Sequence, residues 1–122
     1  MNKPISRVAH GFLDYSAAPL VATAPALLGF KEEKSAANLA YVVGTSIAAL
    51  TASTRAEWGL FKAIPFKTHL TIDLVTAATA LTAPWLFGFA KNTKARNAFL
   101  GIGATLLLTG LLTKPEEMPK YR

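Results

Sequence analysis

Four long apolar stretches, separated by short charged segments, make up most of this chain. The stretches at residues 8–30 and 68–89 each contain one charged residue, Asp14 and Asp73 respectively. The stretches at residues 36–54 and 97–113 contain none. A helix rises about 1.5 Å per residue and a bilayer core is about 30 Å thick, so about 20 apolar residues are enough to cross it. The pattern therefore predicts an all-α membrane protein with four transmembrane helices.

The chain also repeats itself. When residues 5–54 are aligned without a gap on residues 64–113, fourteen of the fifty positions are identical. The identical positions include several polar and helix-breaking residues: His10 and His69, Asp14 and Asp73, Pro25 and Pro84, Gly29 and Gly88, Thr54 and Thr113. Such matches indicate an internal repeat rather than shared apolar composition. Each copy holds two spans, so both copies enter the membrane from the same side. We predict a single domain, residues 1–122, in which two parallel two-helix repeats form a four-helix bundle.

One block within each repeat resembles a known family. Residues 83–89 read Ala-Pro-Trp-Leu-Phe-Gly-Phe, and residues 24–30 read Ala-Pro-Ala-Leu-Leu-Gly-Phe. The pair resembles the Ser-Pro-Trp motif of the SPW repeat family of small bacterial integral membrane proteins, with alanine in place of the serine in both copies. The resemblance implies a multi-pass protein of the bacterial inner (cell) membrane. It implies no activity.

Composition agrees with a membrane location and excludes several classes of protein. The chain is 52% hydrophobic and only 16% charged, more apolar than an average soluble domain. It has no cysteine, which excludes disulfides and zinc–thiolate sites. The basic residues behind its formal charge of +6 are scattered over five short polar segments and form no continuous stripe with interleaved aromatic residues, so we expect no nucleic-acid partner. Anionic lipid head groups are the simpler partner.

The basic residues also predict an orientation. The side with both termini and the central connection carries eight: Lys3, Arg7, Arg55, Lys62, Lys67, Lys114, Lys120 and Arg122. The opposite side carries five: Lys31, Lys34, Lys91, Lys94 and Arg96. Because cytoplasmic loops carry the excess of Lys and Arg, we expect both termini in the cytoplasm. Trp58 and Trp85 fall near opposite membrane surfaces and are expected to anchor the chain there.

The candidate chemistry lies in two His-x-x-x-Asp pairs, which contain the only histidines and the only aspartates of the chain: His10 with Asp14 and His69 with Asp73. A spacing of four residues places both side chains on one helix face. Ionisable residues inside a membrane are costly, so they indicate a site. The default hypothesis is a polar clasp that fixes how the repeats pack. The second is a joint cluster that binds a divalent transition metal or passes protons. The third is a haem held between the two histidines.

No nucleophile with a base and an orienting group is recognisable, and neither is a phosphate loop. We therefore expect no enzymatic activity. The sequence favours a structural or accessory subunit of a larger membrane complex or a homo-oligomer, with no cofactor as the default. The alternative is a metal-binding, haem-binding, proton-relay or carrier protein that uses the four His and Asp residues. Glu57 lies on the same side as these residues and could reach the mouth of their site.

Overall fold

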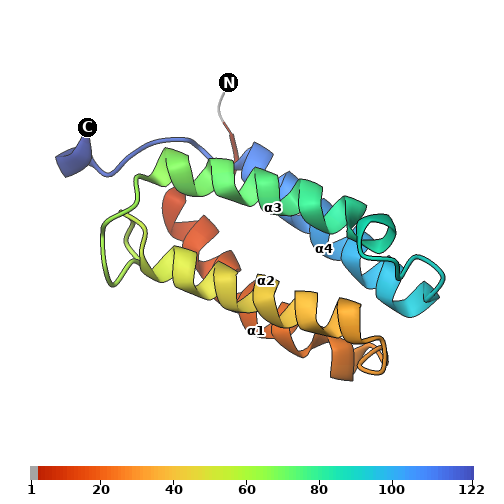
Figure 1. Ribbon diagram of the computed structural model, residues 1–122. Helices are drawn as coiled ribbons and strands as arrows, with labels where there is room; N and C mark the ends of the chain where they lie inside the picture. The colour runs from red at the N-terminus through yellow and green to blue at the C-terminus, as the bar shows by residue number, and fades with distance from the viewer. Residues whose placement is uncertain (1–2) are drawn as a thin grey trace.

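The computed structural model describes residues 3–122 and contains four long α-helices in two hairpins (Figure 1). They are α1 (Arg7–Leu27), α2 (Lys34–Ala52), α3 (Phe66–Leu86) and α4 (Thr93–Leu112), followed by the short 3₁₀ helix η1 (Pro119–Tyr121). α1 packs along α2 and α3 packs along α4, whereas the two hairpins touch each other over shorter segments. This confirms the predicted all-α fold of two repeated helical hairpins.

The first helix of each hairpin is shorter than the apolar stretch that predicted it. α1 and α3 end three residues before the stretches do, because Gly29 and Gly88 adopt φ values of 77° and 75°. A left-handed glycine just after a helix is a common stop signal. The next residue then closes the turn, with Phe30 N–H bonding to the Pro25 carbonyl and the equivalent bond in the second hairpin.

The second helix of each hairpin begins earlier than predicted, inside the charged turn. α4 starts at Thr93, and the side chain of Asn92 caps it by accepting a hydrogen bond from Ala95 N–H. Lys94 and Arg96 therefore lie in its first turn. α2 likewise starts at Lys34. Lysine and arginine can lie near the end of an apolar helix because their long side chains reach out to water.

The ends of the chain pair with each other as the two ends of the central connection do. Thr54 and Ile64, at the two ends of the connection, form an isolated parallel bridge, and Ile5, just before α1, forms the same bridge with Thr113, just after α4. Both termini and the connection thus lie at one end of the bundle, and the two short turns lie at the other (Figure 1). This arrangement has the two-fold pseudo-symmetry expected of a parallel repeat.

Small residues let the paired helices approach closely. A Cβ on Gly44 of α2 would lie 2.7 Å from the Ala18 carbonyl oxygen of α1, and one on Gly103 of α4 would lie 2.6 Å from Leu81 of α3. Both glycines come from the same position of the repeat. At the end with the short turns the core is aromatic, with Phe30, Phe89 and Phe99 buried. The opposite end of the interior holds the His and Asp residues.

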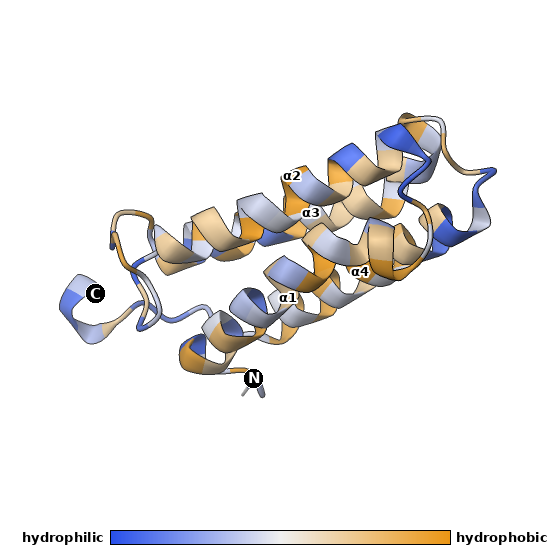
Figure 2. Cartoon of the chain, turned by 90° about the horizontal axis from the view of Figure 1, so that it is seen from below, coloured by the Kyte–Doolittle hydropathy of each residue, from blue (hydrophilic) through white to orange (hydrophobic). Residues whose placement is uncertain are grey.

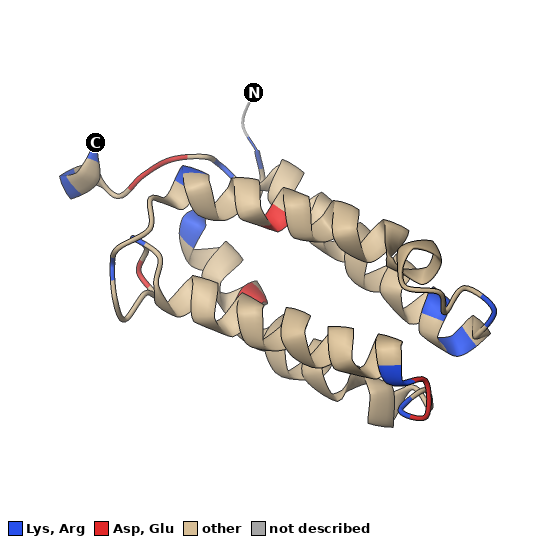
Figure 3. Cartoon of the chain, in the orientation of Figure 1, with Lys and Arg blue, Asp and Glu red and all other residues tan. Residues whose placement is uncertain are grey.

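Hydropathy supports membrane crossing for two of the four helices. Within residues 3–122, α2 and α4 are long and apolar enough to span a bilayer, and α1 and α3 do not meet the same criterion. The helices that fall short are the two that carry the His-x-x-x-Asp pairs, whose polar side chains lower the mean hydropathy. Apolar and weakly polar residues dominate the middle of the bundle (Figure 2), and the lysines and arginines gather at its two ends (Figure 3).

Candidate metal centre

The candidate site is built by equivalent positions of α1 and α3, close to the start of each helix. His10 and Asp14 lie one turn apart on the face of α1 turned toward the second hairpin, and His69 and Asp73 do the same on α3. The histidines are 1% exposed and the aspartates 4%. All four therefore face the interior, as predicted.

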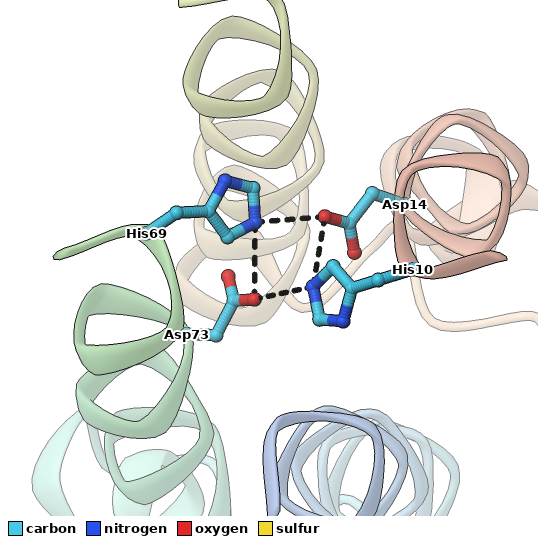
Figure 4. A group of neighbouring side chains, drawn as sticks. All are labelled: His10, Asp14, His69 and Asp73. Atoms are coloured by element: carbon cyan, nitrogen blue, oxygen red, sulfur yellow. Dashed lines mark hydrogen bonds and ion pairs between the residues drawn. The ribbon is translucent and has the colours of Figure 1, made fainter. Parts of the chain in front are cut away.

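The four side chains meet in one closed ring. His10 Nε2 lies 2.8 Å from Asp73 Oδ2 and 3.2 Å from Asp14 Oδ2. His69 Nε2 lies 2.9 Å from Asp14 Oδ2 and 3.1 Å from Asp73 Oδ2. Figure 4 shows these contacts as a quadrilateral with histidine and aspartate at alternate corners. The repeats therefore share a single site, which we call the His/Asp ring.

The shorter contacts in the ring join different repeats. Each histidine lies closer to the aspartate of the other hairpin than to the aspartate one turn along its own helix. The spacing in the sequence predicted the contact within each helix. The tighter contact between repeats depends on how the hairpins pack, and the ring joins them at the end where the chain termini lie.

Two threonines that the sequence analysis did not assign to the site hold the outer nitrogen of each imidazole. Thr113 Oγ1 lies 2.8 Å from His10 Nδ1, and Thr54 Oγ1 lies 2.7 Å from His69 Nδ1. Each hydroxyl donates its proton to the carbonyl four residues earlier in its own helix, so it accepts from the imidazole Nδ1–H. This places a proton on Nδ1 of each imidazole and directs Nε2 into the His/Asp ring. The signal was present in the repeat alignment, where Thr54 matches Thr113.

The connection end of the ring is covered by aromatic side chains. Phe66 is buried, and its ring centroid lies 5.8 Å from those of His10 and His69. Trp58 lies directly on Gly11, where a Cβ would collide with the indole, and its Nε1–H donates to the backbone of α1. Trp58 thus covers the start of α1 next to His10, and its role as a membrane anchor stays a prediction.

One side of the ring borders a cavity. The cavity has a volume of about 210 Å³ between α1 and α4, and Asp14 forms part of a wall that is mainly apolar, with Leu13, Leu20 and Leu106 among its residues. The single hydroxyl proton of Thr51 in α2 is shared between the Ile47 carbonyl at 2.7 Å and Asp14 Oδ2 at 3.1 Å. Asp14 therefore has a threonine neighbour that Asp73 lacks, and it borders this cavity although both aspartates are 4% exposed.

Glu57, which was expected near the mouth of the site, binds Arg7 instead. Arg7 donates from Nε and from the second terminal nitrogen to the two carboxylate oxygens of Glu57, both at 2.8 Å. It also donates to the Glu116 carbonyl at 2.6 Å. The hydrogen bonds from Arg7 lower the pKa of Glu57 below its ordinary value. Arg7 thereby links the central connection to the C-terminal segment outside the ring.

The ring geometry does not suit a haem. The two Nε2 atoms each contact the same two carboxylate oxygens, at 2.8–3.2 Å. A haem iron with two axial histidines needs the plane of the macrocycle between the imidazoles, and here the carboxylates fill that space. What the four atoms offer is two imidazole nitrogens and two carboxylate oxygens, all within 4.8 Å of one another.

The family of the chain follows from its match to a family model. The SPW repeat domain matches residues 8–113, which is most of the chain and includes both hairpins and all four ring residues. The chain belongs to the SPW repeat family. The resemblance carried by the Ala-Pro-Trp block is thereby confirmed. Comparisons with curated proteins and with solved structures find no match.

Proposed function

We propose that this SPW repeat protein is a small multi-pass membrane protein that binds one divalent transition metal ion in its His/Asp ring. The observation that carries the proposal is the set of four ligand atoms, one from each of His10, Asp14, His69 and Asp73, gathered in a buried position. Imidazole with carboxylate is a donor set that suits divalent transition metals. We find no support for enzymatic chemistry and propose none.

The threonines strengthen this proposal. In metal sites the second nitrogen of a ligating histidine usually donates to an oxygen that fixes its tautomer and orientation. Thr54 and Thr113 supply that oxygen to His69 and His10 respectively. With Nδ1 protonated, the lone pair of Nε2 is available to an ion. A ligand set held in this way loses less conformational freedom when the ion binds.

The surface of the protein supports insertion of all four helices into the bilayer. Large apolar side chains are more than half exposed on every helix, including Phe12 and Leu20 of α1, Val42 of α2, Val75 of α3 and Leu108 of α4. Exposed apolar surface of this extent indicates a lipid or protein partner. α1 and α3 can cross despite their polar residues because the His/Asp ring pairs those residues inside the bundle. We further propose the bacterial inner membrane with both termini cytoplasmic and basic ends near anionic head groups.

A structural role is the second candidate, and the contacts between repeats favour it. Without an ion, both Nε2 atoms donate to carboxylates, so two imidazolium groups and two carboxylates balance each other. The tighter contacts join α1 to α3, which closes the two hairpins on each other. In this case the protein serves as a stable subunit of a larger membrane complex or a homo-oligomer.

Metal analysis of the full chain decides between the two candidates. The protein is purified in a mild detergent, and its metal content is measured by mass spectrometry beside an Asp14→Asn/Asp73→Asn double variant. Glu57→Gln is the matched control, because it removes one carboxylate outside the ring. We expect about one transition metal ion per chain in the parent and the control, and none in the double variant. No retained ion in the parent after exposure to divalent metals would overturn metal binding and leave the clasp.

The membrane topology has its own test. Reporter tags at the N-terminus and at the C-terminus should report the same compartment, and a tag in the turn between α1 and α2 should report the other. This result follows from four crossings with both termini at one end of the bundle. Termini on opposite faces of the membrane would show that one helix does not cross.

A further inference from the structure

We infer that the groove between α1 and α4 binds a neutral, lipid-soluble molecule through a hydroxyl group, which donates a hydrogen bond to Asp14 Oδ1. The inference goes beyond the proposed metal site, because it concerns the oxygen of Asp14 that lies outside the His/Asp ring. The apolar part of the molecule lies along the two helices, and its hydroxyl reaches inward from the bilayer.

The second carboxylate oxygen of Asp14 lacks a partner. Oδ2 contacts both imidazoles and shares the hydroxyl proton of Thr51. Oδ1 makes no hydrogen bond within residues 3–122, yet no buried side-chain oxygen or nitrogen there is left unsatisfied, so Oδ1 is open to its surroundings. Figure 4 shows this oxygen turned out of the ring, toward the side on which α4 lies. Because Asp14 is only 4% exposed, a donor for Oδ1 has to enter through the groove.

The groove beside this oxygen consists of two adjoining cavities between α1 and α4. The one bordered by Asp14 has a volume of about 210 Å³, and the other has about 300 Å³. They share four wall residues: Ala17, Leu20, Thr105 and Leu106. Leu20 is 62% exposed, so the groove opens onto the outer surface of the bundle. Sites for small molecules have similar volumes, about 300–1,000 Å³, and mostly apolar walls with a few polar groups.

The polar atoms of the groove accept hydrogen bonds and offer no free donor. Each of the three hydroxyls in its wall donates to a carbonyl of its own helix: Ser16 to Phe12, Thr105 to Gly101 and Thr109 to Leu106. Their oxygens and Asp14 Oδ1 can therefore only accept. An alcohol or a phenol brings the donor that these atoms need. An amide would also bring a carbonyl, which finds no donor here.

Charge balance favours a neutral donor over an ammonium group. Without an ion, the ring has two imidazolium groups and two carboxylates. With a divalent ion, it has two neutral imidazoles and two carboxylates. The net charge of the ring is zero in both states, so an ammonium group would add an unbalanced charge in a mainly apolar groove, which is costly.

The first repeat suggests a variant that narrows the groove. Gly101 lies in the wall of the groove, and its equivalent in the first repeat is Val42. A Cβ on Gly101 would have no atom within 4 Å, so Gly101→Val narrows the groove without disturbing the packing of the hairpins. Ala104→Val is the matched control, because Ala104 is exposed on α4 and does not line either cavity.

The experiment uses the full chain in phosphatidylcholine nanodiscs and a long-chain primary alcohol that carries a photoreactive diazirine. The methyl ether of the same alcohol lacks the donor and is the reference probe. After irradiation, mass spectrometry measures labelling of α1 and α4 at the groove relative to labelling of the outer faces of α2 and α3. We expect this ratio to be about tenfold higher with the alcohol than with the ether. Gly101→Val should remove most of the difference, and Ala104→Val should keep it.

The outcomes separate this inference from the proposed function. Equal ratios for the two probes would overturn the inference, because the groove would then take any apolar chain. A difference that persists in Gly101→Val would overturn the placement in the groove. Gly101→Val keeps all four ring ligands, so its metal content should match that of the parent. Preferential labelling by the alcohol in a parent that retains no ion would overturn the metal site and leave this inference in place.

Discussion

The two repeats carry the same ligands but surround them differently. Phe66, which covers the ring from α3, corresponds in the first repeat to Arg7, which points outward to Glu57. One copy thus contributes an apolar cover over both histidines, and the other contributes a surface ion pair. A strict two-fold site would have two covers or two ion pairs, whereas this one has a single buried aromatic side chain over both histidines.

A second difference lies at the carboxylates. Thr51 donates to Asp14, whereas the equivalent position in the second repeat is Gly110, which has no side chain to offer Asp73. The ligands and their threonine supports are identical in the two copies, and the residues that cover or supplement them are not. Both repeats therefore contribute equally to the contacts within the ring. The residues that surround the ring differ between the repeats.

The largest expected effect comes from breaking the ring itself. Asp14→Asn or Asp73→Asn should each lower the free energy of unfolding by about 3 kcal/mol, because each change leaves two buried imidazolium groups with one carboxylate between them. The double variant should lose about 1–3 kcal/mol less than the sum, since members of one network are not additive. Denaturation in detergent micelles measures all three. Strict additivity would indicate two independent pairs and contradict the shared ring.

The threonine supports should show equal effects in the two repeats. Thr54→Val and Thr113→Val each leave a buried imidazole N–H without an acceptor, which costs about 1–3 kcal/mol. Metal affinity should fall about 10–100-fold in each variant. Thr71→Val is the matched control, since that hydroxyl is exposed and bonds only within its own helix. Effects confined to one of the two variants would show that only one imidazole depends on its threonine.

Phe66 tests the unequal cover. Phe66→Leu should cost about 1 kcal/mol of stability, because a buried ring is replaced by a smaller apolar side chain. It should also speed the exchange of a bound ion with a chelator, since the connection end of the ring loses its cover. Phe61→Leu, at a position that is 71% exposed, is the control and should exchange as the parent does. An unchanged rate in Phe66→Leu would place the route of the ion elsewhere, with the cavity beside Asp14 as the next candidate.

The contact of Thr51 with Asp14, which has no counterpart at Asp73, predicts a small difference in stability between the Asp14 and Asp73 variants. Thr51→Val removes the hydroxyl that donates to Asp14, which should cost about 1 kcal/mol. In that background, Asp14→Asn and Asp73→Asn should become more alike in their effect on stability. Thr45→Val on the outer face of α2 controls for the loss of a hydroxyl. If Thr51→Val leaves the difference between the two aspartates unchanged, that difference has another origin.

The smallest effect is expected at the Arg7–Glu57 pair outside the ring. Its partly exposed carboxylate limits the contribution of the pair to about 0.5 kcal/mol. Because the pKa of Glu57 is lower in the folded protein, this contribution is present above the unfolded value of about 4.3 and is lost as pH falls through the folded pKa. Comparing the pH dependence of unfolding for the parent and Glu57→Gln should show the difference vanish in acid. A difference that persists at the lowest pH would contradict the ion pair.

Much of the fold was predictable from the sequence because the repeat and the apolar stretches are strong signals. Residues 5–54 and 64–113 do form equivalent hairpins. The helix boundaries were less predictable. Gly29 and Gly88 end α1 and α3 inside the apolar stretch, whereas α4 extends into the charged turn from Thr93. Hydropathy measures only how apolar a residue is, so it does not reveal that a left-handed glycine ends a helix or that a capping side chain starts one.

The sequence by itself determined which residues form the site, and the tertiary structure decided how they meet. Helical periodicity places His10 above Asp14 and His69 above Asp73, because residues four apart share a face. The tighter contacts join residues 63 and 55 positions apart, so they depend on the packing of one hairpin against the other. The same packing brings Thr54 and Thr113 to the imidazole Nδ1 atoms, where their hydroxyls accept hydrogen bonds, and places Phe66 over the ring. A periodic pattern specifies one helix at a time, whereas the order of ligands around the ring exists only once both hairpins are in place.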